Sequence, residues 1–351
     1  MFSQERNFTD WKLTGFSSAP AFLFETIEST HKLMKSMASA GEIAPGTLFV
    51  ADSQSNGHGR HERTWDSPAG KNLYFNILIP LEGIPANRFA QITQVAALTF
   101  AEVFNDLQDA AIPENANEKC AIPKNDATAS NNGADSANNK CAISQNDAIL
   151  TSNTNTPPKK ITVKWPNDIL YGKSKFCGIL AEVVYAKWKS PNTSINSVHH
   201  ESGMTNENAG IARENAPRPA LNMGVGINVN SDPEDYAHLN RAVTTLKTIV
   251  GHTINREKLL QQLIGNLERA IGQFKAFGIR PWVAAWKRMD QFIGARGTIV
   301  VNNHCTDQNR ETGEGSIKKS GTIIDMQDDG SLLFKCDDGT TETVISADLE
   351  I

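Results

Sequence analysis

The sequence lacks long hydrophobic runs. No apolar stretch approaches the ~18 consecutive residues that a membrane-spanning helix needs. The first residues also lack the basic segment followed by an apolar one that marks a secretory signal. These absences argue against both a membrane partner and export.

Cysteine is scarce and scattered, with five residues and no C-x-x-C spacing. An odd number at irregular positions is not typical of a disulfide framework or a zinc site, and it favours a reducing, cytoplasmic setting. Excess positive charge is absent as well. The net charge of −5 argues against a general nucleic-acid binder, although a local basic pocket stays compatible with it.

Common catalytic signatures are missing too. The sequence has no HExxH zinc motif, no evident Ser-His-Asp or Cys-His set, and no GxxxxGK[ST] phosphate loop. A conventional P-loop ATPase is therefore excluded. Chemistry in this chain would have to depend on positioning and charge rather than on a protein nucleophile.

The most distinctive stretch that is present is a polar loop within residues 51–76. Apolar runs at 47–51 and 73–79 predict a strand on either side, and about twenty polar residues lie between them, including three glycines and two arginines. Glycines allow backbone N–H groups to approach a ligand, and arginines bind carboxylate or phosphate. The loop predicts an anion-binding site. The alternative is an ordinary solvated surface loop.

Hydrophobic periodicity predicts an α/β (α+β) domain over residues 1–293 and a small β-barrel or sandwich domain over residues 294–351. The first twenty residues could form a strand or a lead-in. Strands are expected at 22–27, 47–51, 73–79, 161–165, 176–185 and 221–229, and helices from Ser29 or Thr30 to near Gly41 and at 87–107, 255–277 and 281–289.

Two polar stretches interrupt this pattern, at residues 108–158 and 189–218. The first holds ten asparagines and no aromatic residue, and KCAIPKNDA from Lys119 recurs as KCAISQNDA from Lys140. Such a composition buries too little apolar surface to offset the entropy of ordering. Both stretches are expected to be disordered insertions.

Three further motifs carry charged residues and glycines: KWPND at 164–168, KSKFCG at 173–178 and GVGIN at 224–228. All are expected at strand ends or in loops. Together with Arg60 and Arg63, they give a set of several cations, one carboxylate and several glycines at such positions.

Such a set suits a reaction between two anions. Joining a carboxylate to the α-phosphate of ATP brings negative charges together, and at ~4 Å their repulsion is worth several kcal/mol at an effective dielectric of ~20. Arginine, lysine and backbone donors, with Mg²⁺ on the phosphates, would offset that repulsion. Adenylate formation is therefore compatible with these residues.

The motifs and their order resemble those of biotin protein ligases. The resemblance covers about residues 22–295 apart from the two insertions, and the β-rich tail is similar to the C-terminal domain of that family. It is carried by EST at 28–30, Q-x-x-GHGR at 54–60, R-x-W at 63–65, NLYF at 72–75, KWPND, K-x-x-GIL at 175–180 and GVGIN.

The resemblance implies a class II synthetase-like catalytic domain, with a mixed sheet and flanking helices, followed by an SH3-like C-terminal domain. It implies an ATP-dependent enzyme that makes biotinyl-5′-AMP and transfers biotin to a lysine of a biotin carboxyl-carrier protein, such as that of acetyl-CoA carboxylase. A monofunctional form is expected, because about twenty residues before the first motif leave no room for a helix-turn-helix DNA-binding domain.

The family also implies roles for single residues. Ser29, Thr30 and Gln54 would bind the ureido group and nearby parts of biotin. Arg60 would hold the carboxylate and then the adenylate phosphate, and Lys175 would neutralise the same oxygens.

Other implied roles are less specific. Lys164 would lie near the phosphates, and Asp168 would orient or deprotonate the incoming lysine amine. Trp65 would pack over the closed loop and Asn228 would lie near the nucleotide, unless they are only a loop anchor and a turn cap. The rest of the expected binding set is Gly57, His58, Gly59, Arg63 and Gly178, and the chain itself is expected to supply no metal site, since Mg²⁺ would arrive with ATP.

The sequence departs from the family pattern at two positions. His58 stands where the first arginine of a GRGR loop is usual, and a neutral imidazole cannot replace a permanent bidentate cation. Residues 29–31 read S-T-H where S-T-N is usual, which puts a polar contact from residue 31 in doubt.

Competing interpretations remain at this stage. A lipoate–protein ligase or octanoyltransferase shares the fold, but KWPND with K-x-x-GIL and the β-rich tail favour biotin. A non-catalytic biotin sensor is a second alternative, favoured by His58 and opposed by the intact Arg60, Lys164 and Lys175. A DNA-binding repressor fits worst, given the acidic charge.

Overall fold

The computed structural model describes residues 8–60, 63–111, 160–188, 217–239, 242–301, 317–345 and 347–351. Most of both expected insertions, including the KCAI repeats, lies outside these residues. Two insertion boundaries are wrong. The helix before the first insertion continues to Ala111, and the strand after the second begins at Arg218. Gln108, Asp109 and the two following alanines extend the helix without any breaking residue.

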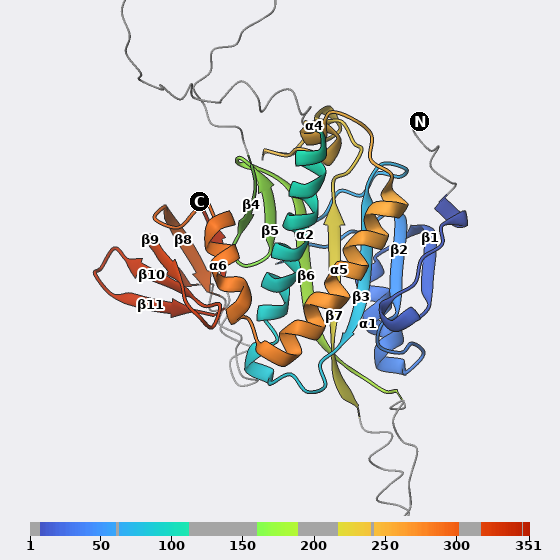
Figure 1. Cartoon of the computed structure of the whole chain (residues 1–351), viewed down its shortest axis with the longest axis horizontal. Helices are drawn as coiled ribbons and strands as arrows, with labels where there is room; N and C mark the ends of the chain where they lie inside the picture. The colour runs from blue at the N-terminus through green and yellow to red at the C-terminus, as the bar shows by residue number, and fades with distance from the viewer. Residues whose placement is uncertain are drawn as a thin grey trace, which may run out of the picture.

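The larger part of the protein is built on a seven-stranded mixed sheet of order β1-β2-β3-β7-β6-β5-β4 (Figure 1). The first two strands pair in parallel, and every other neighbouring pair is antiparallel. This arrangement confirms the expected mixed α/β class. The strands are β1 (Ala21–Ile27), β2 (Leu48–Gln54), β3 (Leu73–Pro80), β4 (Ile161–Lys164), β5 (Asp168–Tyr171), β6 (Ser174–Ala186) and β7 (Arg218–Ile227).

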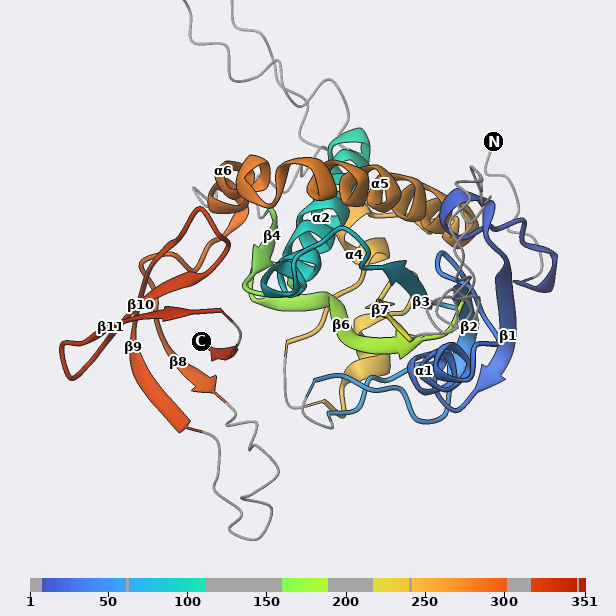
Figure 2. The same ribbon diagram turned by 90° about the horizontal axis from the view of Figure 1, so that it is seen from below.

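Helices cover both faces of this sheet. Figure 2 shows α1 (Thr30–Ala40) on one face and α2 (Gln91–Ala111) with α5 (Arg256–Phe277) on the other. No helix in the described part of the chain is long and apolar enough to cross a membrane. The described residues also form α4 (Leu246–Val250), α6 (Arg280–Met289) and the short 3-10 helices η1 (Phe8–Asp10), η2 (Phe16–Ser18), η3 (Ala86–Arg88) and η6 (Pro233–Tyr236).

Local chemistry explains the position of α1. The Ser29 side chain accepts a hydrogen bond from the backbone N–H of Lys32, and Gly41 ends the helix in the left-handed conformation at φ 80°. Both ends agree with the sequence-based expectation. The helix N-terminus therefore lies directly after β1, at the edge of the pocket described below.

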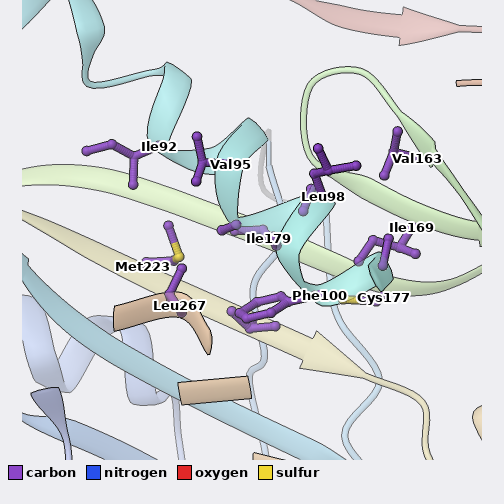
Figure 3. Close-up of a cluster of buried hydrophobic side chains, with 14 of the residues drawn as sticks. Ile92, Val95, Leu98, Phe100, Val163, Ile169, Cys177, Ile179, Met223 and Leu267 are labelled. Carbon is purple, nitrogen blue, oxygen red and sulfur yellow. The ribbon is translucent and has the colours of Figure 1, made fainter. Parts of the chain in front are cut away.

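The main core lies between the sheet and helices α2 and α5. Figure 3 shows Ile92, Val95, Leu98 and Phe100 of α2 gathered with side chains from the sheet and from α5. A smaller cluster under α1 includes Met34, which is fully buried. A rigid sheet packed on both faces holds the strand ends and their polar residues in fixed positions.

The C-terminal residues form a separate five-stranded antiparallel sheet of order β11-β10-β9-β8-β12. This confirms the expected β-rich tail, which lies beyond β4 and α6 in Figure 1. The two parts touch: Trp165 Nε1 and Gln94 Nε2 both donate to the carbonyl of Gly330. The strands are β8 (Arg296–Val301), β9 (Ile317–Met326), β10 (Leu332–Cys336), β11 (Thr341–Val344) and β12 (Asp348–Glu350).

Several elements differ from expectation. Residues 8–10 and 16–18 form 3-10 turns, so the possible N-terminal strand is wrong within the described residues. Strands β5 and β12 and helix α4 were not predicted, because each has only three to five residues and shows little periodicity. The KWPND motif lies at the turn between β4 and β5, with a cis peptide bond at Trp165–Pro166.

Candidate functional site

A pocket lies on the α1 side of the main sheet, at the end of β2 and under the loop that follows it. Its walls come from the start of α1, the loop, strands β3, β6 and β7, and the first residue of β12. Most of the residues proposed from the sequence meet here: Ser29, Thr30, Gln54, His58, Gly59, Arg60, Arg63, Trp65, Asp168, Lys175 and Gly178.

One wall is polar and uncharged. The backbone N–H and the hydroxyl of Thr30 both lie 3.0 Å from Oε1 of Gln54, and the hydroxyl is 2.7 Å from the side-chain amide of Asn76. Ser29 and Asn76 are almost fully buried, with exposed fractions of 2% and 1%. Buried polar groups of this kind are suited to recognising a small neutral polar group by hydrogen bonding.

A second group of lining residues, called here the cationic wall, carries the cations. Arg60 Nη1 lies 3.2 Å from Oδ1 of Asp348, 3.2 Å from the carbonyl of Ala347 and 3.5 Å from Oδ1 of Asn167. Arg63 Nη2 lies 3.6 Å from the other carboxylate oxygen of Asp348. One residue of the C-terminal sheet therefore holds both arginines of the loop at the pocket.

Lys175 supplies the third cation. Its Nζ donates to Oδ1 of Asp168 at 2.6 Å and lies 5.3 Å from the centre of the Trp65 ring. Arg60, Arg63 and Lys175 outnumber the two carboxylates that pair with them, Asp168 and Asp348. Within this cluster the excess is positive, which favours binding of an anion.

Glycines form the floor. Gly178 and Gly226 are directly opposite each other on β6 and β7, and the Trp65 indole lies against both. A Cβ atom at residue 226 would come within 2.6 Å of Trp65 Nε1, and one at residue 178 within 2.9 Å of Trp65 Cζ3. Only glycine leaves room for the ring to lie on the sheet.

The loop itself is folded back on its own backbone. The N–H of Gly59 donates to the carbonyl of Arg63 at 2.6 Å, and the N–H of Trp65 donates to the carbonyl of Gly57 at 2.9 Å. His58 lies inside this turn, with Nδ1 2.6 Å from the carbonyl of Asn56. Since a carbonyl only accepts, Nδ1 of His58 carries the proton.

Three proposed residues do not line the pocket. Gly57 lies against the backbone of the loop, where a Cβ would meet the carbonyl of Trp65 at 2.5 Å. Lys164 places Nζ 5.9 Å from the centre of the Phe292 ring, and burial lowers the pKa of its ammonium group. Asn228 is buried and accepts a hydrogen bond from the Tyr236 hydroxyl at 3.1 Å, which agrees better with the structural alternative.

Sequence reasoning did not single out Asn76, Asn167 or Asp348. Asn167 belongs to KWPND, and Asn76 directly follows NLYF, so the motifs could have indicated both residues. Asp348 had no signal, because it begins the unpredicted strand β12 and reaches the pocket only through the packing of the C-terminal sheet.

The chain was also compared with known protein families, sequences and structures. A model of the biotin/lipoate A/B protein ligase family matches residues 23–197. A bifunctional ligase/repressor, BirA, of Salmonella typhimurium is 26% identical over 277 residues, which cover 79% of this chain and 61% of that protein. The chain thus spans about three fifths of that relative's length.

A biotin–[acetyl-CoA-carboxylase] ligase of Mycobacterium tuberculosis is 21% identical over 320 residues, covering 91% of this chain and 84% of the relative. Among solved structures, biotin protein ligase from Aquifex aeolicus in complex with biotin and ATP superimposes with a TM-score of 0.57 at 18% identity, covering 94% of this chain and 97% of the other. The family that matches the sequence and the solved structure with a similar fold are both of protein ligases. The chain belongs to the biotin/lipoate A/B protein ligase family.

Proposed function

We propose that this protein is an ATP-dependent biotin protein ligase. It activates biotin as biotinyl-5′-AMP and then transfers biotin to a lysine of a carrier domain, such as the biotin carboxyl-carrier protein of acetyl-CoA carboxylase. The Aquifex relative was solved with biotin and ATP, and the Mycobacterium relative carries the name of such a ligase. Both support the proposal.

The observation that carries the proposal is the division of the pocket into two walls. Ser29, Thr30 and Gln54 form a neutral polar wall, which suits a ureido group. Arg60 and Lys175 lie on the cationic wall, which suits a carboxylate and a phosphate at the same point. A ligand that is neutral and polar at one end and anionic at the other satisfies both walls.

The two reacting groups are both anions, and the cationic wall offsets their repulsion. Lys175 is held by Asp168 at 2.6 Å, so the ammonium group is ordered before a ligand arrives. Cations that are already in place cost little reorganisation when charge develops on the phosphate. Mg²⁺ would accompany the phosphates of ATP and neutralise them further.

The transfer step needs an amine acceptor. Asp168 is the carboxylate next to Lys175, and we assign to it the orientation or deprotonation of the incoming lysine amine. An entering phosphate that draws Lys175 away would leave this carboxylate as an acceptor for the amine proton.

ATP–pyrophosphate exchange tests the proposal. Exchange should require biotin, and neither lipoate nor octanoate should replace it. Lys175→Ala should reduce exchange by roughly 100-fold, because it removes one preorganised charge at the reacting phosphate. Lys287→Ala is the matched control, since Lys287 also pairs with an aspartate at 2.6 Å but lies on α6, outside the pocket.

The family description includes lipoate ligases, and the same exchange assay distinguishes that alternative. Exchange with lipoate or octanoate instead of biotin would assign the chain to the lipoate-type activity. Tight biotin binding without exchange would identify a non-catalytic sensor.

A further inference from the structure

The turn between β9 and β10 of the C-terminal sheet reaches the KWPND motif. The carbonyl of Gly330 in this turn accepts hydrogen bonds from Trp165 Nε1 at 3.2 Å and from Gln94 Nε2 at 2.8 Å. Both donor side chains are almost completely buried, with exposed fractions of 1% and 2%. A buried donor that moves away from its acceptor is left unpaired, which costs free energy. The Gly330 carbonyl therefore holds the Trp165 indole in one place.

The turn that carries this carbonyl is held by its own hydrogen bonds. The N–H of Gly330 donates to the carbonyl of Gln327 at 2.9 Å, and the N–H of Gln327 donates to the carbonyl of Ser331 at 2.8 Å. Ser331 is 2% exposed, and its N–H donates to Oδ1 of Asp329 at 3.0 Å. The Gly330 carbonyl is thus a fixed point on the C-terminal sheet.

The position of Trp165 is passed along the KWPND motif. The next residue is Pro166, whose ring restricts φ. The N–H of Asn167 then donates to the carbonyl of Lys164 at 3.1 Å, which closes the turn, and Asp168 begins β5. Little conformational freedom remains between the Trp165 indole and the Asp168 carboxylate.

The same sheet also contacts Arg60. The carbonyl of Ala347 and Oδ1 of Asp348 each lie 3.2 Å from Arg60 Nη1, and Oδ1 of Asn167 lies 3.5 Å from that nitrogen. Strand β12, which begins at Asp348, pairs with β8, and β8 pairs with β9, which runs into the turn at Gly330. One hydrogen-bonded sheet therefore holds both Arg60 and the motif that Arg60 contacts.

We propose that Trp165 is a positioning residue for the reaction: through its bond to Gly330, the C-terminal sheet sets the distance between the KWPND turn and Arg60. The inference rests on the proposed function, because Arg60 and Lys175 must reach the same reacting anions. Trp165 does not line the pocket itself, so it acts through the motif rather than on a ligand.

This role separates the rate of the reaction from the affinity for biotin. None of the contacts described above involves the neutral polar wall, which is formed at the start of α1 and the end of β2. Biotin affinity should therefore not depend on Trp165. The rate should depend on it, since a misplacement of about 1 Å at the reacting groups can cost roughly 100-fold.

The first test is Trp165→Phe, which removes the N–H donor and keeps an aromatic side chain. The maximal rate of biotin-dependent ATP–pyrophosphate exchange should fall about tenfold or more. The dissociation constant for biotin, measured by titration calorimetry on the full chain, should change less than about twofold. An unchanged rate, or a loss of affinity equal to the loss of rate, would overturn the inference.

The second test moves the acceptor instead of the donor. In Gly330→Ala the new Cβ would lie 2.4 Å from Gln94 Oε1 and 2.8 Å from Ile279 Cδ1, so the turn must shift. Gly339→Ala is the matched control, because Gly339 is in the same sheet at φ 89°, against 81° for Gly330, but a Cβ there meets nothing within 4 Å. Both variants carry the strain of alanine at positive φ. Only Gly330→Ala should slow exchange, by several-fold and at unchanged biotin affinity, and equal rates in the two variants would contradict the proposal.

Combining the changes shows whether they act through one contact. Trp165→Phe with Gly330→Ala should slow exchange no more than the stronger single change, whereas multiplied losses would indicate two independent structural effects and reject the inference. In ¹H–¹⁵N spectra, the indole signal missing from Trp165→Phe should move in Gly330→Ala and stay in place in Gly339→Ala. Normal exchange in every variant would overturn this inference and leave the proposed function intact. Absence of biotin-dependent exchange in the wild type would remove both.

Discussion

Asp348 of the C-terminal sheet and Arg60 of the loop after β2 meet at the pocket, with Oδ1 of the aspartate 3.2 Å from Nη1 of the arginine. Asn167 and the carbonyl of Ala347 contact the same nitrogen. Three oxygen atoms thus contact Nη1 of the guanidinium group. The C-terminal sheet thereby contributes to the cationic wall of the site.

This contact predicts a functional effect of Asp348→Asn. Loss of the charged partner of Arg60 and Arg63 should reduce biotin-dependent exchange by about tenfold, since a charge-assisted hydrogen bond is worth ~1.5–3 kcal/mol. Glu350→Gln is the matched control, because Glu350 is on the same strand but pairs with the exposed Lys318. Faster exchange in Asp348→Asn would instead show that Asp348 competes with the substrate anion.

The glycine floor predicts that Gly226→Ala displaces the Trp65 indole. The new Cβ would lie 2.6 Å from Nε1, so the ring must move and the loop must open. Tryptophan emission should change, and biotin affinity should fall by about tenfold or more, consistent with an overpacking cost of ~1–3 kcal/mol. Unchanged emission and affinity would show that the ring is not confined.

A matched glycine lies in α5, where a Cβ at Gly272 would meet nothing within 4 Å. Gly272→Ala should leave biotin affinity unchanged. It should raise the free energy of unfolding by about 0.5–1 kcal/mol, because alanine loses less backbone entropy in a helix. Urea unfolding measures this difference.

A buried ion pair at the base of the loop predicts a large stability effect. Arg256 is 5% exposed, donates to Asp52 at 2.8 Å and to the carbonyl of Asn72 at 3.1 Å, and lies over the Trp11 ring. Arg256→Met should lower the free energy of unfolding by roughly 3–5 kcal/mol, since it leaves the Asp52 carboxylate without this partner.

The control for that change is Arg296→Met. Arg296 pairs with Asp337 at the same distance of 2.8 Å, but the two side chains are 70% and 49% exposed. An exposed pair contributes at most about 1 kcal/mol. Equal losses in the two variants, measured by urea unfolding, would contradict a special role for the buried pair.

His31 predicts a pH dependence of stability. Burial lowers its pKa in the folded chain, so unfolding takes up a proton as the pH falls below 6.5. The free energy of unfolding should therefore decrease with falling pH, by at most ~1.4 kcal/mol per pH unit, until the folded pKa is reached. His31→Asn lacks this contribution. Parallel stability curves from pH 7.5 to 5.5 would argue against a buried neutral ring.

The sequence was sufficient where a local rule decides the structure. Ser29 and Gly41 predict both ends of α1. The resemblance to biotin protein ligases, rather than a local rule, predicts that Arg60 and Lys175 meet. Tertiary packing decided the positions of the residues that the sequence did not predict correctly. Asn228 is buried and accepts a hydrogen bond from Tyr236. Asp348 reaches Arg60 only because the C-terminal sheet packs against the larger part of the protein, which no spacing rule encodes.

The most direct measurement is to incubate the wild type with biotin, ATP and Mg²⁺ and to identify by mass spectrometry what the protein retains. The account predicts biotinyl-5′-AMP with release of pyrophosphate, and far less of both in Lys175→Ala. Retained biotin beside intact ATP would contradict it, because the cationic wall would then bind substrates without joining them.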